Sequence, residues 1–296
     1  MATISQGAWG SVVQKDLSLV FLNNYSDFES MLPLIFRFKD AEQGTEYDLE
    51  MPDLPAVGTF RGDIDYVDAQ EGYKKAVTET EYAQGLKFTR RLLRNDLYGA
   101  VQGLVGTMAQ RFRALRETVG ANVFNNAFGS FTVGDGLSLC NSAHTSRNGG
   151  ANQSNTGTAA LSAANVFATG NSMLKFKSNT DQIITNTPDT LIVPLDLAEK
   201  AYEIISSSGK VDTSVNNRNF HEGRYKLIVW PNWLTDADSW FMVNSKRMRD
   251  QLVFREWEAT EFARSGDFDN KVSKYAGYTS FGISTVEWRW VYGNQV

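Results

Sequence analysis

One helical stripe between Asn95 and Phe128 constrains the fold more than any other feature of the sequence. Apolar residues recur there at steps of three or four, which places them on one face of a helix; they are Leu97, Val101, Leu104, Met108, Phe112, Leu115, Val119 and Val123. About 30 helical residues form a rod of roughly 45 Å. Glycines at 99, 103, 106 and 120 each cost about 0.5–1 kcal/mol relative to alanine. Such a rod therefore needs a long packing surface from the rest of the chain.

The segment from Asp40 to Arg91, which precedes this helix, is polar. Glycines separate short alternating runs within it, such as Ile64–Val67, a pattern typical of extended hairpin strands. A polar segment of this length is uncommon as a plain loop in a compact domain. We expect it to be either disordered or stabilised by a neighbouring molecule.

Residues 1–40 show no long sustained period and are interpreted as an arm. Within them Ser26 and Glu29 match a capping box. Pro33 is expected to end any short helix that begins there, because proline cannot donate a backbone hydrogen bond.

Beyond the helix the pattern changes to a polar surface loop over 129–157, which is rich in Asn, Gly and Ser. Helices are then expected after Ser162 and after Asp196, each with that residue as its N-cap. Strands are expected at 190–193, at about 225–230 and at 239–243. This alternation predicts a small lobe in which helices cover a mixed sheet. The runs Trp230–Val243 and Tyr275–Gly293 hold most of the tryptophans and predict strands with extensive packing partners.

Composition excludes several classes of function. The chain has 42% hydrophobic and 21% charged residues, as ordinary globular proteins do. A net charge of −5 gives no electrostatic attraction to phosphates, so sequence-specific DNA binding is not expected. Cys140, the one cysteine, cannot form an intrachain disulfide. The N-terminus lacks a secretory signal pattern and no stretch approaches the roughly 18 apolar residues of a transmembrane helix, which predicts a cytoplasmic protein without membrane association.

Few residues are suited to metal binding or catalysis. His144 and His221 lack the spacings of zinc ligands, and we expect both to be structural, the first facing solvent and the second in a turn. The acid pairs Asp63 with Asp65 and Asp236 with Asp238 are expected to be solvated. The sequence therefore predicts no catalytic, cofactor-binding or metal-binding residue.

Two serine–lysine pairs match the S-x-x-K pattern of some acylating enzymes, namely Ser172 with Lys175 and Ser207 with Lys210. Neither has the S-D-N or K-T-G companion motifs. A hydrolase that uses Ser207 with Lys210 or His144 is nevertheless kept as an alternative from a different functional class.

Two basic groups lie outside any nucleotide-binding motif: Arg90, Arg91 and Arg94 at the foot of the long helix, and Lys246, Arg247 and Arg249. On an acidic chain, contact with the carboxylates of another chain is favoured over contact with nucleic acid. The alternative is a solvated surface, since exposed ion pairs contribute only about 0–1 kcal/mol.

Several short sequences follow one another in a distinctive order from about residue 55 onward. They are F-R-G-D-I, K-F-T-R-R-L-L-R-N-D-L-Y-G, S-N-T-G-T-A-A-L-S-A-A-N-V, T-P-D-T-L-I-V-P-L-D-L, P-N-W-L-T-D-A-D-S-W-F and W-V-Y-G. Together with the order of arm, hairpin, helix and lobe, they resemble a tailed-phage major capsid protein of the Hong Kong 97 type, particularly the Mu-like major head subunit group.

The resemblance implies an α+β fold of the Hong Kong 97 capsid type, with an axial domain of mixed sheet flanked by helices. The implied segments are an N-terminal arm (1–40), an E-loop hairpin (41–92), a peripheral domain with the spine helix (93–158), the axial domain (159–250), return strands of the peripheral domain (251–277) and a final axial-domain strand (278–296).

It further implies a major head protein that assembles as pentamers and hexamers into an icosahedral shell around double-stranded DNA, without sequence-specific binding. Expected partners are further copies of the chain, a portal, a separately encoded scaffolding protein and decoration proteins. The protein would assemble in the bacterial host cytoplasm and reside in the virion. An encapsulin-like compartment that encloses cargo enzymes is the alternative.

Contacts between subunits are expected from the hairpin and from the foot of the helix. The candidate residues are Lys74, Lys75, Arg90, Arg91 and Arg94. Some relatives join subunits covalently through an E-loop lysine, but its asparagine and glutamate partners are not identifiable here, and no crosslink is predicted. Many relatives carry a cleaved N-terminal scaffolding segment, but from the short distance between Met1 and the hairpin we expect none here.

Overall fold

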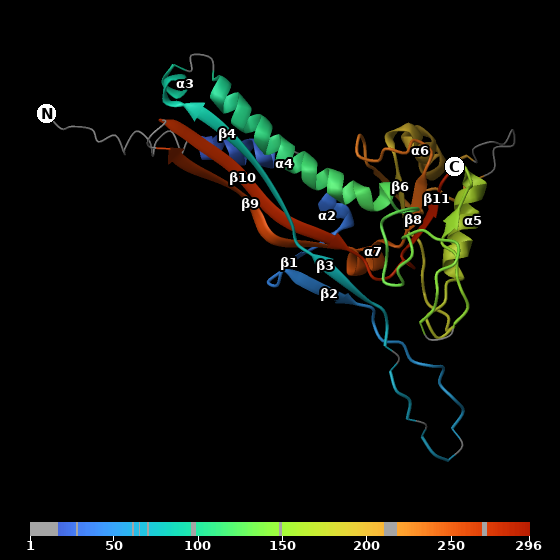
Figure 1. Cartoon of the computed structure of the whole chain (residues 1–296). Helices are drawn as coiled ribbons and strands as arrows, with labels where there is room; N and C mark the ends of the chain where they lie inside the picture. Colours follow the sequence, from blue (N-terminus) through green and yellow to red (C-terminus); the bar gives the residue numbers. More distant parts are fainter. Residues whose placement is uncertain are drawn as a thin grey trace.

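The computed structural model describes residues 17–27, 29–60, 62–64, 66–69, 71–95, 99–147, 150–209, 218–267 and 271–296. An elongated part and a rounded lobe meet at an angle, and a hairpin projects from their junction (Figure 1). The elongated part holds the long helix and the long strands, whereas the lobe holds short strands and several shorter helices of its own.

The elongated part is built on a four-stranded sheet with the order β1-β9-β10-β4. The strands are β1 (Arg37–Asp40), β9 (Val253–Asp267), β10 (Val272–Ser284) and β4 (Thr80–Thr89). β1 runs parallel to β9, and the other pairs are antiparallel. Helix α4 (Ala100–Asn125) covers one face so closely that a Cβ added at Gly277 would collide with the Phe112 ring.

The predicted long helix is present, but it begins later than expected. The short helix α3 (Arg90–Arg94) comes first, capped by the Thr89 side chain, and Gly99 then takes a left-handed φ of 67° before α4 starts. This conformation, which glycine adopts at little cost, separates the two helices.

The apolar stripe of α4 was only partly predicted. Val101, Met108 and Phe112 are buried, whereas Leu104 is 49% exposed and Val105 is buried instead. The difference arises because α4 packs against both the sheet and the helix at 17–26, whose Leu17 and Phe21 join the same core, and this widens the buried face. Leu97 lies outside the described residues.

The N-terminal expectations are corrected by the structure. Ser26 Oγ donates to the Asn23 carbonyl at the end of the helix at 17–26 and does not cap a new helix. Pro33 lies in the first turn of α2 (Leu32–Ile35) and does not end a helix. Backbone N–H groups in the first turn have no partner within the helix, so the N–H that proline lacks costs no hydrogen bond there.

The lobe contains a five-stranded sheet with the order β5-β11-β8-β6-β7. Its strands are β5 (Thr156–Gly157), β11 (Val291–Asn294), β8 (Trp240–Val243), β6 (Thr190–Val193) and β7 (Lys226–Val229). The β5–β11 and β6–β7 pairs are parallel, and β8 pairs antiparallel with β11 and β6. The predicted strands of the lobe are therefore confirmed. Of the run Trp230–Val243, however, only β8 is a strand, and Trp230 is buried in the chain that leads to it.

Four helical segments belong to the lobe and its border with the elongated part: α5 (Ala163–Leu174), the 3-10 turn η1 (Leu195–Leu197), α6 (Ala198–Ser206) and α7 (Ser245–Gln251). Ser162 caps α5 as predicted, since its side chain accepts from the Asn165 amide. Asp196 does not cap α6, because it lies inside η1, which runs directly into that helix.

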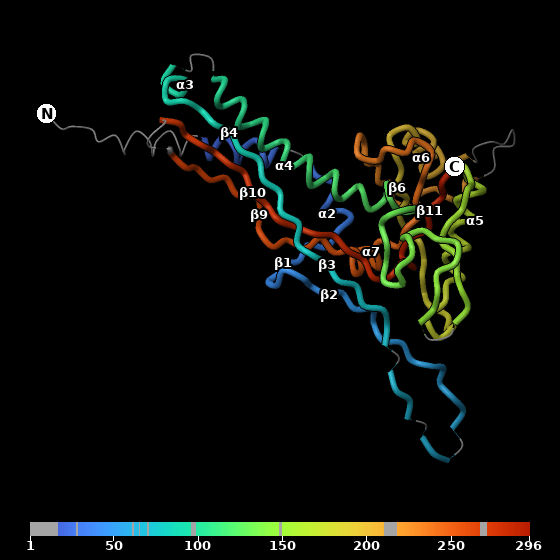
Figure 2. The backbone as a smooth tube through the Cα atoms, viewed as in Figure 1, coloured from blue at the N-terminus to red at the C-terminus, as the bar shows by residue number. Residues whose placement is uncertain are grey.

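The projecting hairpin consists of β2 (Thr45–Leu49) and β3 (Lys74–Thr78), which pair antiparallel. The connecting segment is called loop 50–73, and its described residues extend far from the rest of the molecule (Figure 2). Within the segment 41–92 predicted as the hairpin, β4 instead pairs with β10 in the four-stranded sheet. Likewise, β10 reaches Ser284, so that only β11 from 278–296 joins the lobe sheet. As domain boundaries, the six segments remain predictions.

Candidate assembly site

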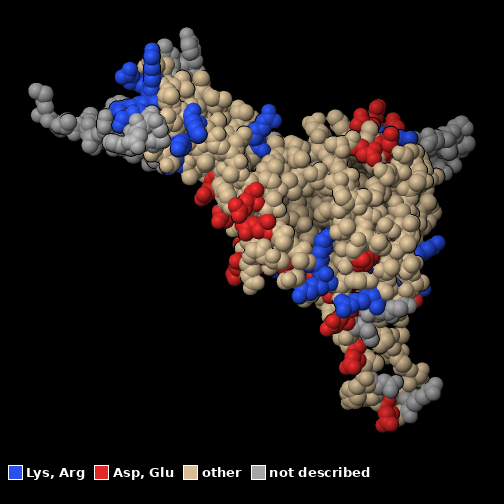
Figure 3. All heavy atoms as spheres, viewed as in Figure 1, with Lys and Arg blue, Asp and Glu red and all other residues tan. Residues whose placement is uncertain are grey.

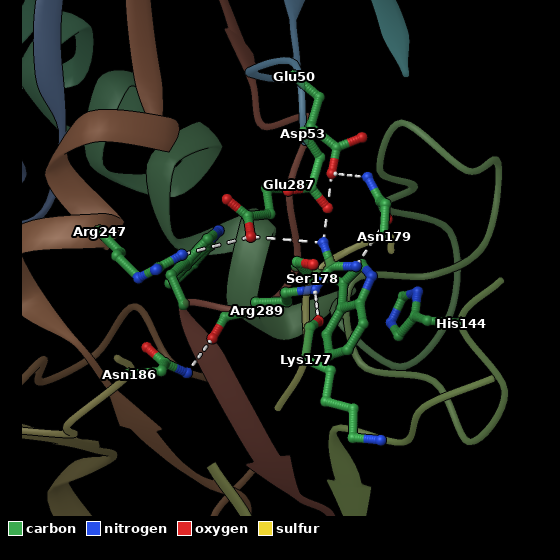
Figure 4. A network of polar contacts seen from close by, with 12 residues as sticks. Glu50, Asp53, His144, Lys177, Ser178, Asn179, Asn186, Arg247, Glu287 and Arg289 are labelled. Carbon is green, nitrogen blue, oxygen red and sulfur yellow. Dashed lines mark hydrogen bonds and ion pairs between the residues drawn. The ribbon is translucent and has the colours of Figure 1, made fainter. Parts of the chain in front are cut away.

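Arg289, which lies just before β11, fixes the start of loop 50–73 to the lobe (Figure 4). Its guanidinium is 3.2 Å from Glu50 Oε1 and donates to Asn179 Oδ1 at 2.7 Å and to the Lys177 carbonyl at 2.7 Å. Glu50 also accepts from Asn179 Nδ2 at 2.8 Å. Arg289 and Glu50 are both buried, so each charge is compensated by hydrogen bonds as well as by its partner.

The two ends of the loop are joined at the same place. The Glu50 amide donates to the Tyr73 carbonyl at 2.9 Å, and the Tyr73 amide donates to Glu50 Oε2 at 2.9 Å. We call Glu50 and Tyr73 the loop root. Because the loop root is bound to Arg289, the loop leaves the molecule in a direction that the lobe determines.

Glu287 extends this network toward α7. Its carboxylate lies 3.4 Å from Arg289 and 3.5 Å from Arg247, beside a cavity of about 580 Å³ between the loop root and α7. Burial raises the pKa of the Glu287 carboxyl, and the two arginines oppose that rise. Arg247, one of the predicted basic residues, is thus engaged within the chain.

A second buried arginine, Arg255 of β9, fixes the hairpin to the elongated part. Its guanidinium is 3.2 Å from Glu46 and forms a close ion pair with Asp48, and both acids belong to β2. Ser284 of β10 also donates to Asp48. The hairpin is therefore held from two sides, by the sheet through Arg255 and by the lobe through Arg289.

Of the predicted contact residues, Lys74 and Lys75 lie on β3. The ammonium of Lys74 stands 3.8 Å over the Tyr47 ring. That of Lys75 donates to the Thr132 carbonyl and stands 5.0 Å from the Phe131 ring. Burial lowers the pKa of Lys75 to about 8, although Asp48 and Asp135 act in the opposite direction. Lys75 therefore has partners within the chain, and its part in contacts between subunits stays a prediction.

The lowered pKa of Lys75 predicts a pH dependence of hairpin docking. Between pH about 8 and 10.5, Lys75 is protonated to a greater extent in the unfolded chain than in the folded chain. Stability rises with pH wherever the unfolded state binds more protons. Relative to Lys75→Met, the wild-type chain should thus gain stability as pH rises through this window, as measured by urea unfolding. Lys74→Met should retain the wild-type dependence, and an identical pH profile in Lys75→Met would contradict the prediction.

Arg90, Arg91 and Arg94 all lie exposed on α3, at the end of the elongated part that is farthest from the lobe (Figure 1). The predicted contact residues therefore form two separate groups. Sequence reasoning missed Glu50, Arg255 and Arg289. One signal was available, because an arginine between Trp288 and Trp290 is flanked by rings that need burial.

Both histidines have structural partners. His144 is only 1% exposed, so the predicted solvent-facing position is wrong. Its Nδ1 is 2.7 Å from Asp135, its Nε2 is 3.1 Å from Asn155, and its ring stacks on Trp288. The polar loop folds around this ring, and the buried polar groups satisfy one another. His221 is buried as well, with Nε2 2.9 Å from the Ala163 carbonyl.

The serines proposed as nucleophiles are bound to backbone carbonyls. Ser207 Oγ donates to the Gly209 carbonyl at 2.8 Å, and Ser172 Oγ donates to the Ala168 carbonyl at 3.1 Å, one helical turn back. Lys210 and Asp65 lie outside the described residues. Asp236 accepts from Ser239 Oγ and is only partly exposed, whereas Asp238 is exposed as expected.

Within the described part of the chain, no group of three or more His, Cys, Asp or Glu residues is placed to hold a metal ion. In that same part, no helix is long and apolar enough to cross a membrane. Cys140 is buried, and burial raises the pKa of its thiol.

Many solved structures share this fold, and three of them illustrate it. The bacteriophage JBD30 procapsid matches with a TM-score of 0.54 at 10% identity, over 99% of this chain and 76% of that one. The mature capsid of bacteriophage PhiM1 matches with a TM-score of 0.56 at 12% identity, over 90% and 87%. A virus-like particle from Pyrococcus furiosus gives 0.54 at 9% identity, over 95% and 98%. The fold is thus the α+β fold of Hong Kong 97-type capsids.

The sequence gives the more specific assignment. Residues 72–294 match the model of a family described as phage capsid protein, so the chain belongs to that family. No curated protein is significantly similar to it in sequence. The chain is a major capsid protein and not an enzyme, and the encapsulin-like alternative is not favoured.

Proposed function

We propose that this protein assembles as pentamers and hexamers into an icosahedral shell that encloses double-stranded phage DNA. The observation that carries the proposal is the family match over residues 72–294. A net charge of −5 fits this role, because a shell wall should enclose DNA without binding each phosphate. A portal, a separately encoded scaffolding protein and decoration proteins are the further partners we propose, with assembly in the bacterial host cytoplasm.

Electron microscopy of the purified protein tests this proposal. We expect closed shells with five-fold and six-fold clusters when the chain is expressed with the scaffolding protein of the same phage. Particles purified from infected cells should contain double-stranded DNA. Shells that contain cargo enzymes and no nucleic acid would support the encapsulin-like alternative, and a protein that remains monomeric in both settings would contradict the proposal.

In this shell, loop 50–73 would be covered by a neighbouring subunit. It exposes apolar side chains that the described part of the chain leaves mostly uncovered, including Met51, Val57, Phe60 and Tyr66, and Val57 is fully exposed. Apolar groups in such number are costly in water and typical of a contact surface. The loop also has little secondary structure of its own to resist proteolysis.

We therefore expect chymotrypsin to cleave the free subunit after Phe60 and Tyr66 and to leave these bonds intact in the shell. Mass spectrometry of the fragments identifies the cleavage sites. The variant with Phe60→Ser and Tyr66→Ser is the control, because it removes both sites from the loop. Equal cleavage of the free subunit and the shell would exclude docking of this loop on a neighbour.

A further inference from the structure

The face of the four-stranded sheet opposite α4 carries acidic side chains in its middle. Strand residues alternate between faces, and since Gly277 faces α4, its neighbour Tyr278 faces away. The register places Glu81 and Glu258 beside Ser280, and Glu261 beside Tyr278. A register shift in the β9–β10 pair between these two positions brings Glu258 and Glu261, three residues apart, to the same face. These three glutamates are exposed. We call the surface that they define, with the adjacent Glu79, the acidic face.

Contacts on the sheet show that these carboxylates converge. Glu79 accepts from Ser280 Oγ at 2.6 Å. Desolvation raises the pKa of the Tyr278 phenol, and the charges of Glu81, Glu258 and Glu79 raise it further. Glutamates from two strands on either side of β10 thus act on one ring.

Next to the acidic face, the same side of the sheet is nearly flat. Ala276 of β10 lies between Gly85 of β4 and Ala263 of β9, and all three are exposed. Small side chains on adjacent strands leave no obstacle to another molecule. A partner can therefore approach the acidic face along the strands.

Basic side chains gather at the far end of the same elongated part (Figure 3). Arg90, Arg91 and Arg94 are exposed on α3, and Lys87 is exposed on the end of β4 that leads into it. We call α3 with its three arginines the basic end. Figure 3 shows the acidic side chains further along the sheet, toward the hairpin.

The basic end and the acidic face of one molecule are too far apart to neutralise each other. Glu81 and Arg90 are separated by nine residues of nearly continuous strand, which at about 3.3 Å per residue spans roughly 30 Å. The Debye length at physiological ionic strength is about 8 Å, so the interaction over that distance is screened. Among the described residues, neither surface therefore neutralises the other.

A second copy of the chain supplies both complementary charges at once. In a head-to-tail contact between identical subunits, the basic end of one copy meets the acidic face of the next, and the same contact can repeat from copy to copy. Nucleic acid would pair with the basic end but be repelled by the acidic face. Charge complementarity thus favours a second copy as the occupant.

We propose that the acidic face, centred on Glu81, Glu258 and Glu261, is the docking surface for the basic end of a second copy of this chain. The inference rests on the proposed function, since it identifies one contact through which subunits associate. Arg90, Arg91 and Arg94 of one copy then face the three glutamates of the other. Arginine suits this role because its planar group can bind a carboxylate through two hydrogen bonds.

Charge reversal on each side, and then on both sides, tests the pairing. One variant carries Arg90→Glu, Arg91→Glu and Arg94→Glu, a second carries Glu81→Lys, Glu258→Lys and Glu261→Lys, and a third carries all six changes. We expect each one-sided reversal to lower the yield of shells at least about tenfold, since reversed interfacial charges oppose association. The variant that carries all six changes restores opposite charges across the contact and should recover most of that yield. The control carries Glu199→Lys together with Lys200→Glu, because both of these side chains are exposed on α6.

Circular dichroism and thermal unfolding should show that all variants fold, because the six residues are exposed. The inference is overturned if either one-sided variant assembles as the wild type does. It is also overturned if the variant with all six changes gives no higher yield of shells than the one-sided variants.

A cysteine pair detects the contact even without shells and so separates this inference from the proposed function. Chains with Arg91→Cys and Glu258→Cys together should form disulfide-linked oligomers on mild oxidation, whereas either change alone should not. Cys140 is buried and should not interfere. Disulfide-linked oligomers without shells would contradict the proposed function but leave the contact intact. Shells without disulfide-linked chains would overturn the contact but leave the proposed function intact.

Discussion

Arg289→Ala should destabilise the folded chain by about 3–5 kcal/mol, because it leaves the carboxylates of Glu50 and Glu287 buried without their shared partner. The loop root should also detach from the lobe, since Asn179 and the Lys177 carbonyl lose the donors that hold them. Urea unfolding measures the first effect, and hydrogen exchange at the Tyr73 amide measures the second.

Arg218→Ala is the matched control for this prediction. Arg218 pairs with Glu222 at 3.8 Å, but its side chain is almost fully exposed, and the change should have little effect on the midpoint of unfolding. If Arg289→Ala were no more destabilising than Arg218→Ala, the buried network would not hold the loop root. Arg289→Lys should recover only part of the lost stability, since the single nitrogen of lysine cannot occupy the three nitrogen positions from which the planar guanidinium donates.

Phe112→Ala should cost about 3–5 kcal/mol and yield protein that is insoluble or fails to assemble. The Phe112 ring fills the space between α4 and β10 where Gly277 leaves room for it. Its centroid lies 6.2 Å from that of the Phe21 ring in an edge-to-face arrangement. Its removal opens a cavity that neither the helix nor the long strands can easily close.

Leu104→Ala on the same helix is the control, because Leu104 is half exposed and should change stability by less than about 1 kcal/mol. Denaturant unfolding of both variants, followed by electron microscopy of the soluble fraction, makes the comparison. A Phe112→Ala protein that is soluble and assembles normally would contradict the packing described here.

Local patterns were sufficient to predict much of the fold. The strand at 190–193 and the cap at Ser162 follow from nearest-neighbour chemistry, and both are confirmed. The start of α4 was not predictable in the same way, because the left-handed turn at Gly99 does not interrupt the apolar spacing. Val105 is buried in place of the predicted Leu104 because of the helix at 17–26, and no periodicity within α4 reveals that helix.

The candidate site depends on contacts between distant parts of the chain. Arg289 and Glu50 are 239 residues apart, and each looks like an ordinary surface residue in its own segment. His144 was assigned to solvent for the same reason, since Asp135 and Asn155 surround it only after the loop has folded. Burial of charge is thus decided by tertiary structure, and the sequence indicated it only through the tryptophans beside Arg289.

The joined ends of loop 50–73 have a consequence for variation in its length. The hydrogen bonds between Glu50 and Tyr73 close the loop independently of what lies beyond them. Doubling the length of a flexible loop adds only about 0.6 kcal/mol of closure entropy. Insertions near Val57 or Ile64 should therefore leave the subunit folded while they lengthen its reach, so that the distance this hairpin spans can change over evolution without any change to the residues that hold it.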